Sequence, residues 1–336
     1  MIIITYTSFS LKKIVLTYFF AFPLFYFFSY TNYNLENKND YTTSKKIDRT
    51  AEKMRSFVID ISKFAKELNP KFSIIPQNGL ELCFNELEVS NGMHKEYLSS
   101  IDGIGIESLF YSNEDSNTEE KLTALNLLKE TKKILVSDYT KSKKTAELSI
   151  RKNQKKGFTS FPREKENYDY SIVPDNINNE NDTNINFLSQ TCNFLYLINY
   201  SNFESKEAVL NKLKNTNYDL LLIDLFFDKT SFTKQEIESL KIKKNGGKRL
   251  VISYINIGAA EKFRYYWKPK WRIGFPSWLK KNYEGYEDEF WVKFWKKSWQ
   301  KIIFEDKDSY VQKIVEAGFD GAYLDNVECY YFLEFD

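Results

Sequence analysis

Eight short apolar segments recur along this chain, and most are separated by stretches long enough for a helix. These segments are 72–76, 103–108, 134–137, 158–161, 194–198, 220–223, 250–255 and 322–324. Apolar residues at helical spacing occupy several intervening stretches, at 122–128, 208–213, 235–240 and 310–317. Strands and helices that alternate over about 290 residues predict an α/β fold, specifically a (β/α)8 TIM barrel, whose usual size is about 250 residues before insertions.

The two ends of this pattern are out of order for such a barrel. An amphipathic helix at 51–68 comes before the first strand, and the chain stops a few residues after its last strand. We therefore expect this helix to cover the strand at 322–324, which makes the chain a circularly permuted TIM barrel. The Asn-rich segment 174–190 would join a former C-terminus to a former N-terminus. Two half-domains hinged at that segment are the alternative.

The N-terminus has the pattern of an export signal. Lys12 and Lys13 precede an apolar run at 14–28, which is shorter than the ~20 residues of a spanning helix. We expect an exported protein that is secreted, periplasmic or anchored to the cell envelope. Residues 1–30 would be either a cleaved signal peptide or a retained membrane tether. The polar residues 31–47 would form a flexible link to a single domain at 48–336.

Composition excludes several classes of chemistry. The 48 basic and 46 acidic side chains leave a net charge of +2, so no nucleic-acid partner is expected. The single histidine, His94, and three cysteines without a CxxC pair do not fit a zinc site. A Ser-His-Asp enzyme is equally disfavoured, because the chain has no GxSxG motif. We expect neither a metal nor a cofactor, and the sequence indicates no oligomeric state.

Polar side chains stand at the C-terminal ends of seven predicted strands, where TIM barrels place their catalytic groups. They are Asn78, Glu107, Asp138, Asn199, Asp224, Asn256 and Asp325. Four of them are carboxylates, and glycoside hydrolysis requires a pair of carboxyl groups. Asp and Asn also cap helices that follow strands, so capping is the alternative for any single one, and above all for Asp138.

The six tryptophans all lie between the strand at 250–255 and the helix at 310–317. They are Trp267, Trp271, Trp278, Trp291, Trp295 and Trp299. The last three recur every four residues, which predicts a packed helix. The first three are candidates for a substrate groove, because flat aromatic faces suit the apolar faces of sugar rings. A local mini-core is the alternative.

Several motifs resemble glycoside hydrolase family 114, the endo-α-1,4-polygalactosaminidase-like barrels. Four of them are YINIGAAEKFRYYW at 254–267, FPSW at 275–278, WVKFW at 291–295 and GFDGAYLD at 318–325. The others are PQNG at 76–79, GIESLFY at 105–111, VSDY at 136–139 and GF at 157–158. This second group resembles the C-terminal half of the family although it comes first here, which agrees with a permuted barrel.

The resemblance implies hydrolysis of α-1,4-linked, galactosamine-containing polysaccharide. By motif position, Asp325 would be the nucleophile or its electrostatic equivalent, and Glu107 would be the acid/base. Burial beside apolar neighbours should raise the pKa of Glu107, while Asp325 should stay ionised near Asn326 and Asn78. The resemblance further implies that the substrate-binding cleft is lined by Asp224, Glu261, Arg264, Tyr265, Asn78 and Asp138.

This chain departs from the family pattern at two positions. It has Ala259 where family members often have an acid, and Glu328 where they have an aspartate. These departures leave open a non-catalytic glycan-binding or surface-interaction protein on the same barrel. A hydrolase that holds Mg²⁺ or Ca²⁺ through carboxylates alone is a third possibility.

Overall fold

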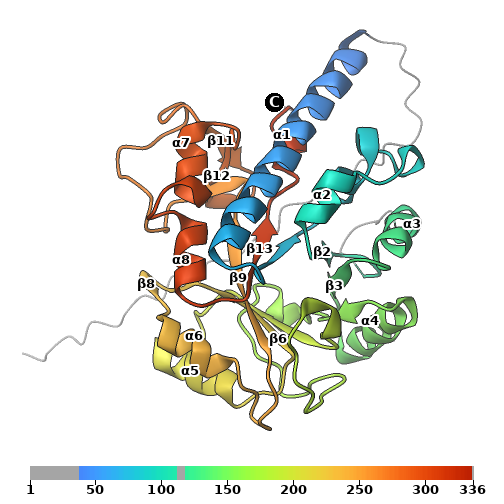
Figure 1. Cartoon of the computed structure of the whole chain (residues 1–336), viewed down its shortest axis with the longest axis vertical. Coiled ribbons are helices and arrows are strands. Elements are labelled where there is room, and N and C mark those ends of the chain that lie inside the picture. The colour runs from blue at the N-terminus through green and yellow to red at the C-terminus, as the bar shows by residue number, and fades with distance from the viewer. Residues whose placement is uncertain (1–37, 112–117, 335–336) are drawn as a thin grey trace, which may run out of the picture.

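The computed structural model describes residues 38–111 and 118–334. The expected leader at 1–30 lies outside these residues. Each of the eight apolar segments contains a strand of the parallel framework (Figure 1). The strands are β1 (Ser73–Pro76), β2 (Gly103–Glu107), β3 (Lys133–Ser137), β4 (Thr159–Ser160), β5 (Phe194–Leu197), β6 (Leu220–Asp224), β9 (Leu250–Asn256) and β13 (Gly321–Asp325). The predicted α/β class is therefore confirmed.

Parallel pairing arranges these strands in two sheets. One sheet has the order β1-β13-β9-β6-β5, and the other has the order β2-β3-β4. A parallel bridge between Gln77 and Gly105 connects β1 to β2, so the strands follow the chain order cyclically. Between β4 and β5, the described residues form no ladder, although the rings of Phe161 and Phe194 lie 5.6 Å apart. The described strand pairings therefore do not close a barrel.

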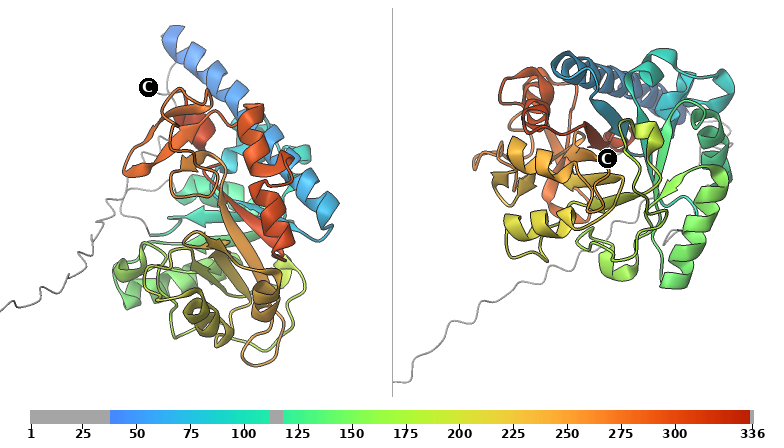
Figure 2. Two further views of the ribbon diagram at one scale, coloured as in Figure 1. Left: turned by 90° about the vertical axis from the view of Figure 1, so that its left-hand side faces the viewer. Right: turned by 60° about the horizontal axis from the view of Figure 1, so that its bottom comes forward.

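Helices lie around the outside of the strands (Figure 2). They are α1 (Lys38–Leu68), α2 (Lys95–Ser100), α3 (Thr118–Leu128), α4 (Lys143–Lys156), α5 (Lys206–Lys214), α6 (Lys234–Leu240), α7 (Lys297–Gln300), α8 (Tyr310–Glu316) and α9 (Cys329–Phe332). All four stretches with helical spacing in the sequence contain a helix. Within the described residues, no helix combines the length and the apolar character needed to cross a membrane.

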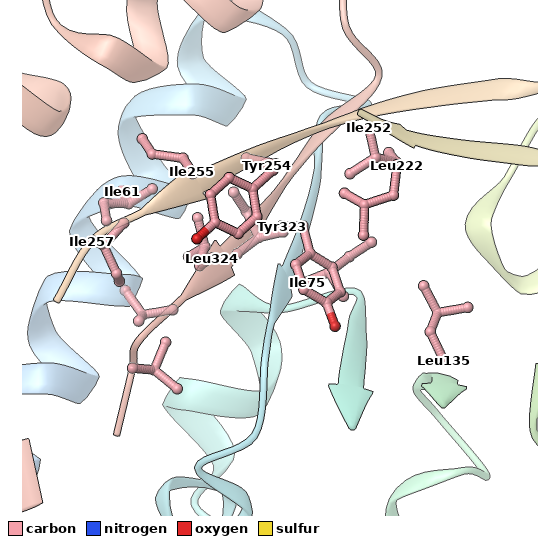
Figure 3. Close-up of a cluster of buried hydrophobic side chains, with 14 of the residues drawn as sticks. Ile61, Ile75, Leu135, Leu222, Ile252, Tyr254, Ile255, Ile257, Tyr323 and Leu324 are labelled. Carbon is pink, nitrogen blue, oxygen red and sulfur yellow. The ribbon is translucent and has the colours of Figure 1, made fainter. Parts of the chain in front are cut away.

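The helix expected at 51–68 forms the second half of α1. Its residue Ile61 is fully buried in the same cluster as Leu324 of β13 and Ile255 of β9 (Figure 3). The first and last strands of the chain pair directly, since Ser73 of β1 is in register with Gly321 of β13. Because α1 begins at Lys38, it also includes part of the segment that we expected to be a flexible link.

A separate antiparallel sheet is inserted between β9 and α7. It has the order β10-β12-β11 and consists of β10 (Ala259–Glu261), β11 (Leu279–Tyr283) and β12 (Tyr286–Val292). Trp291 lies in β12 and Trp299 in α7, so the single helix predicted from their spacing is wrong. The four-residue spacing is a coincidence, since β12 and α7 each bury one of these tryptophans in the core. A smaller hairpin pairs β7 (Phe226–Phe227) with β8 (Thr230–Ser231).

The Asn-rich segment 174–190 runs between β4 and β5 and is tied to the framework by buried charges. Lys243 donates to Asp219 at 2.6 Å, and both side chains are completely buried. The same ammonium group donates to the carbonyl oxygens of Asn181 and Thr183. This ion pair therefore fixes part of the segment against the start of β6.

Candidate active site

The C-terminal ends of β2 and β13 bring Glu107 and Asp325 to the same edge of the parallel framework. Strand β1 lies between them, paired with β13 on one side and bridged to β2 on the other. The charge of Glu107 raises the pKa of Asp325, as expected for two carboxyl groups at one edge of the framework. We call Asp325 and Glu107 the carboxyl pair.

Asp325 accepts two hydrogen bonds from neighbouring groups. The hydroxyl group of Tyr254 donates to Oδ2 at 2.6 Å, and the backbone N–H of Asn326 donates to Oδ1 at 2.7 Å. Burial raises the pKa of Asp325 to about 6, even though the bond from Tyr254 lowers it. Among the described residues, the expected donor Asn78 does not bond to this carboxyl group. Its amide donates to Glu328 instead, and its Oδ1 accepts the backbone N–H of Glu107. Asp325 therefore titrates much closer to neutral pH than an ordinary aspartate.

Glu107 has a different environment, because a cation holds it. Nη2 of Arg163 donates to its Oε1 at 2.9 Å, and the hydroxyl group of Tyr170 donates to the same oxygen. Asn78 accepts the backbone N–H of Glu107 through Oδ1 at 3.1 Å. Burial raises the pKa of Glu107, as expected from its apolar neighbours, while the charge of Arg163 lowers it. The side chain keeps 16% of its surface exposed, so it remains accessible.

Left-handed backbone conformations concentrate at this edge. Ser108 follows Glu107 with φ 56°, and Asn326 follows Asp325 with φ 59°. Asn78, two residues after β1, has φ 59°, and Tyr170 has φ 57°. Non-glycine residues adopt such angles at a cost of about 1 to 3 kcal/mol, and these residues cluster at functional sites. The strain is an independent indication that the ends of β1, β2 and β13 form a site.

A third carboxyl group, Glu289, approaches from the inserted sheet. Asn256 is in register with Asp325, and its amide donates to Oε2 of Glu289 at 3.4 Å. The hydroxyl group of Tyr283 donates to Asn326 at 3.2 Å and ties the same sheet to the end of β13. Burial and the charges of Glu261 and Asp325 raise the pKa of Glu289 well above its ordinary value.

Glu328, one of the two positions that depart from the family pattern, lies beside the carboxyl pair. It accepts a hydrogen bond from the amide of Asn78 at 3.1 Å. Burial and the charge of Glu81 raise its pKa to about 8, although the bond from Asn78 lowers it. Asn78 therefore connects Glu328 to the backbone of Glu107.

Asp224, Glu261 and Arg264 form a closed cluster rather than an open cleft wall. Arg264 lies 2.7 Å from Oδ2 of Asp224 and 2.6 Å from Oε2 of Glu261. The three side chains keep 5%, 4% and 7% of their surface exposed, respectively. Because each charge is already paired and covered, we assign this cluster a structural role.

Asp138 is also closed off from solvent. Its Oδ1 accepts the backbone N–H groups of Leu109, Phe110 and Tyr111, and its Oδ2 accepts the hydroxyl group of Ser149 at 2.6 Å. Its side chain is completely buried. Asp138 thus holds the loop that follows Glu107. It neither caps a helix nor lines a cleft, in contrast to the two roles considered from the sequence.

The groove expected from three tryptophans is largely a mini-core. Trp278 is 1% exposed, and its ring packs 4.9 Å from Trp271 and 4.8 Å from Trp299. Trp267 and Trp271 are partly buried and pack on each other at 5.4 Å. By contrast, Tyr265 is 41% exposed, and its hydroxyl group donates to the carbonyl oxygen of Asp308. Trp278 is therefore closed to a sugar ring, whereas Tyr265 remains available.

The sequence interpretation missed Arg163, Tyr170, Tyr254 and Glu289. Arg163 is 56 residues from Glu107, and Tyr254 is 71 residues from Asp325. Glu289 lies in β12 of the inserted sheet, whereas we expected catalytic carboxyl groups at the ends of the parallel strands. The IN motif after Tyr254 could have drawn attention to that tyrosine, but no local pattern marks the other three.

Within residues 38–111 and 118–334, no group of three or more His, Cys, Asp or Glu side chains is arranged to hold a metal ion. His94 caps α2 by accepting the backbone N–H of Tyr97. The chemistry available at the carboxyl pair is proton transfer by one carboxyl group and stabilisation of positive charge by another.

One family model matches part of this chain. The sequence model of glycoside-hydrolase family GH114 matches residues 207–335, which include β6, β9 and β13 with Asp325. This match makes the C-terminal part of the chain similar to that family. Glu107 and the rest of the N-terminal part lie outside it.

Three curated relatives match shorter segments. The uncharacterized protein MJ1477 of Methanocaldococcus jannaschii is 39% identical over 154 residues, which cover 45% of this chain and 41% of the relative. An uncharacterized protein of Thermotoga maritima is 29% identical over 119 residues, with 35% of each chain covered. An uncharacterized protein of Deinococcus radiodurans is 30% identical over 121 residues, which cover 36% of this chain and 37% of the relative. The chain thus spans less than half the length of each of these relatives.

Proposed function

We propose that this protein is a glycoside hydrolase that uses Asp325 and Glu107 as its two catalytic carboxyl groups. The observation that carries the proposal is that β13, β1 and β2 lie side by side and place both residues at one edge of the framework. The other strand-end acids, Asp138 and Asp224, are hydrogen-bonded or ion-paired and are buried. The GH114 match supports the reaction class and includes Asp325. No metal or cofactor is part of this proposal.

In the proposed reaction, Glu107 gives its proton to the glycosidic oxygen as the bond to the anomeric carbon breaks. Asp325 either bonds to that carbon or stabilises the positive charge that develops on it. A water molecule then attacks the anomeric carbon, and a carboxylate accepts the proton that the water releases. Tyr254 keeps a hydroxyl group on Asp325 and so stabilises its anionic form.

The substrate that we propose is an α-1,4-linked polysaccharide that contains galactosamine. The family resemblance of the sequence motifs supports this choice. Glu289 and Asp325 form no ion pair with a cation among the described residues, and burial raises the pKa of both. A protonated amino sugar would supply a cation that favours their ionised forms.

We also propose that the two sheets form one circularly permuted (β/α)8 barrel, closed between β4 and β5 through side chains. The cyclic strand order and the burial of Ile61 of α1 together with Leu324 of β13 support this architecture. Export through the N-terminal segment, cleaved or retained as a tether, belongs to the same proposal and rests on the sequence pattern at 1–30.

The direct test uses the full chain and partially deacetylated α-1,4-galactosaminogalactan, with products detected by mass spectrometry. Asp325→Asn and Glu107→Gln should each reduce kcat/KM by at least about a hundredfold. Glu287→Gln, which changes an exposed residue of β12, is the matched control and should keep the wild-type rate. Unchanged activity in either site variant would contradict the assignment.

A glycan-binding protein without turnover is the second candidate. The ion pair between Arg163 and Glu107 favours it, because a neighbouring cation opposes protonation of the proposed acid. Binding to a glycan array without any product would support this candidate and exclude the hydrolase.

A further inference from the structure

Arg163 is a completely buried cation beside the carboxyl pair. It follows β4 in the chain, and its side chain has 0% of its surface exposed. The guanidinium carbon lies 3.7 Å from the ring centroid of Tyr139 and 3.8 Å from that of Tyr170. Two aromatic rings therefore fix the position of the planar guanidinium group, and such contacts strengthen when water is excluded.

The two terminal nitrogens of Arg163 are directed at specific acceptors, whereas its buried Nε has no hydrogen-bond partner among the described residues. Nη1 donates to the carbonyl oxygen of Tyr168 at 3.0 Å, and Nη2 donates to Oε1 of Glu107 at 2.9 Å. Tyr170 contributes a second donor to the same Oε1. Arginine and tyrosine thus hold one oxygen of the Glu107 carboxyl group from a rigid support.

The backbone around Arg163 is braced by the segment that also supports Glu107. The N–H of Arg163 donates to the carbonyl oxygen of Asp138 at 2.8 Å, and its carbonyl oxygen accepts the N–H of Thr140 at 2.7 Å. The carboxyl group of Asp138 binds the backbone N–H groups that follow Glu107. One continuous network therefore locates both partners of the ion pair.

We propose that Arg163 is the positioning residue of Glu107, which fixes the orientation of its carboxyl group and keeps it able to both release and accept a proton. This inference rests on the proposed glycosidase function. Arg163 acts through Glu107 and has no contact with the substrate in this scheme.

The physical basis is a balance of two opposing influences on Glu107. Burial favours the neutral acid and raises its pKa, whereas the charge of Arg163 favours the anion and lowers that pKa. A group that acts first as an acid and then as a base needs both forms near the working pH. The charge of Lys121 and a hydrogen bond from Gln77 also lower this pKa, but less than the charge of Arg163 does. Without Arg163, burial would therefore keep Glu107 protonated over a wider pH range.

A second buried arginine provides a matched control. Arg249 is 2% exposed and donates to the carbonyl oxygens of Leu240, Leu213 and Ile242 and to Thr216. Within the described part of the chain, no carboxylate bonds to this side chain. Its replacement removes a buried guanidinium group of the same size without touching the carboxyl pair.

The experiment compares Arg163→Met, Arg163→Lys and Arg249→Met in the full chain. In Arg163→Met, the basic limb of the pH profile of kcat/KM should move upward by about one to three pH units, because the pKa of Glu107 rises when its cation is removed. The value of kcat should fall at least about tenfold with little change in KM. Arg163→Lys should restore part of the rate and part of the shift. Arg249→Met should lower the Tm and leave the pH profile unchanged.

An unchanged basic limb in Arg163→Met, or the same response from Arg249→Met, would overturn the proposal. If Arg163→Met does not fold, Arg163→Lys and Tyr170→Phe are compared instead, and both should show smaller upward shifts. If the wild-type protein has no hydrolytic activity, the proposed function fails separately. In that case the pKa of Glu107 is measured by carbon-detected NMR, and an upward shift in the Arg163 variant supports the positioning role, while no shift contradicts it.

Discussion

The carboxyl pair and the closed cluster begin from the same kind of sequence position but have opposite environments. Asp325 and Asp224 each end a buried strand of one parallel sheet. Asp224 forms two ionic contacts with Arg264, at 2.9 and 2.7 Å, and is almost completely covered. Asp325 has one tyrosine hydroxyl group and one backbone N–H instead of a cation, and its pKa is raised to about 6.

The comparison shows how a structural carboxylate differs from one that can react. A fully paired buried charge has its solvation replaced by fixed partners, so changing its protonation state is costly. A buried carboxyl group with fewer donors exchanges its proton near neutral pH, which suits acid and base catalysis. Strand-end position identifies candidates, and the pairing and exposure of each candidate together separate these two roles. Glu107 is paired with Arg163 but keeps 16% of its side chain exposed, whereas Asp224 is paired and keeps only 5%.

The largest effect is expected from breaking the closed cluster. Arg264→Met should lower the free energy of unfolding by about 3 to 5 kcal/mol, because it leaves two buried carboxylates without their cation. Urea unfolding monitored by tryptophan fluorescence measures this change. Lys262→Met, which breaks the exposed contact with Asp288, should cost less than about 1 kcal/mol. Similar losses in the two variants would remove the distinction between closed and open carboxylates.

Asp138→Ala should cost about 2 to 3 kcal/mol, since it leaves the backbone N–H groups of Leu109 and Phe110 without their shared acceptor. Thermal unfolding measures the loss, and Asp175→Ala, at an exposed position that pairs with Lys212, is the control. A stable Asp138 variant that loses only substrate binding would restore this residue to the cleft.

Asp325→Asn should stabilise the protein at pH 7.5 by about 1 to 2 kcal/mol while it removes activity. The folded protein binds the Asp325 proton more tightly than the unfolded chain, so wild-type stability falls as the pH rises from the ordinary pKa of 3.8 to about 6. The asparagine variant has no such loss, and its advantage should therefore be smaller at pH 5 than at pH 7.5. Paired unfolding curves at these pH values check the sign. A variant that is less stable than the wild type at pH 7.5 contradicts the assigned environment.

The smallest effect is expected from Ser108→Gly. Relief of the left-handed conformation at φ 56° is offset by the greater freedom of glycine in the unfolded chain, so stability should change by less than about 0.5 kcal/mol. Activity should still fall severalfold, because the residue after Glu107 is less restricted. The measurement compares kcat/KM with the midpoint of urea unfolding. A stabilisation above about 1 kcal/mol without loss of activity would show that the strain has no function.

Apolar spacing predicted the eight parallel strands and five of the helices because these signals are local. The two-residue strand β4 lies within a four-residue apolar segment, and even this short element was placed correctly. The inserted sheet was missed because β11 reads as Leu279-Lys-Lys-Asn-Tyr283 and has few apolar residues. Trp291, Trp295 and Trp299 recur at a helical interval, so spacing alone gave the wrong element for Trp291, which lies in β12.

Gly105 is a closely packed position in β2. The segment 103–108, which the sequence predicts as a strand, contains this glycine. In the structure, a Cβ atom at Gly105 would lie 1.9 Å from the hydroxyl group of Tyr323, so only glycine fits. The partner that makes this position tight is 218 residues away and was not predictable from spacing.

The amino-acid sequence by itself determined the α/β class, the order of strands and helices, and the acids that end the strands, because periodicity and chain punctuation act within a few residues. The tertiary structure decided which of those acids are paired with Arg163 or Arg264 and which remain only partly satisfied. Charge interactions and burial depend on distances in space between residues far apart in the chain, and a linear pattern does not contain those distances.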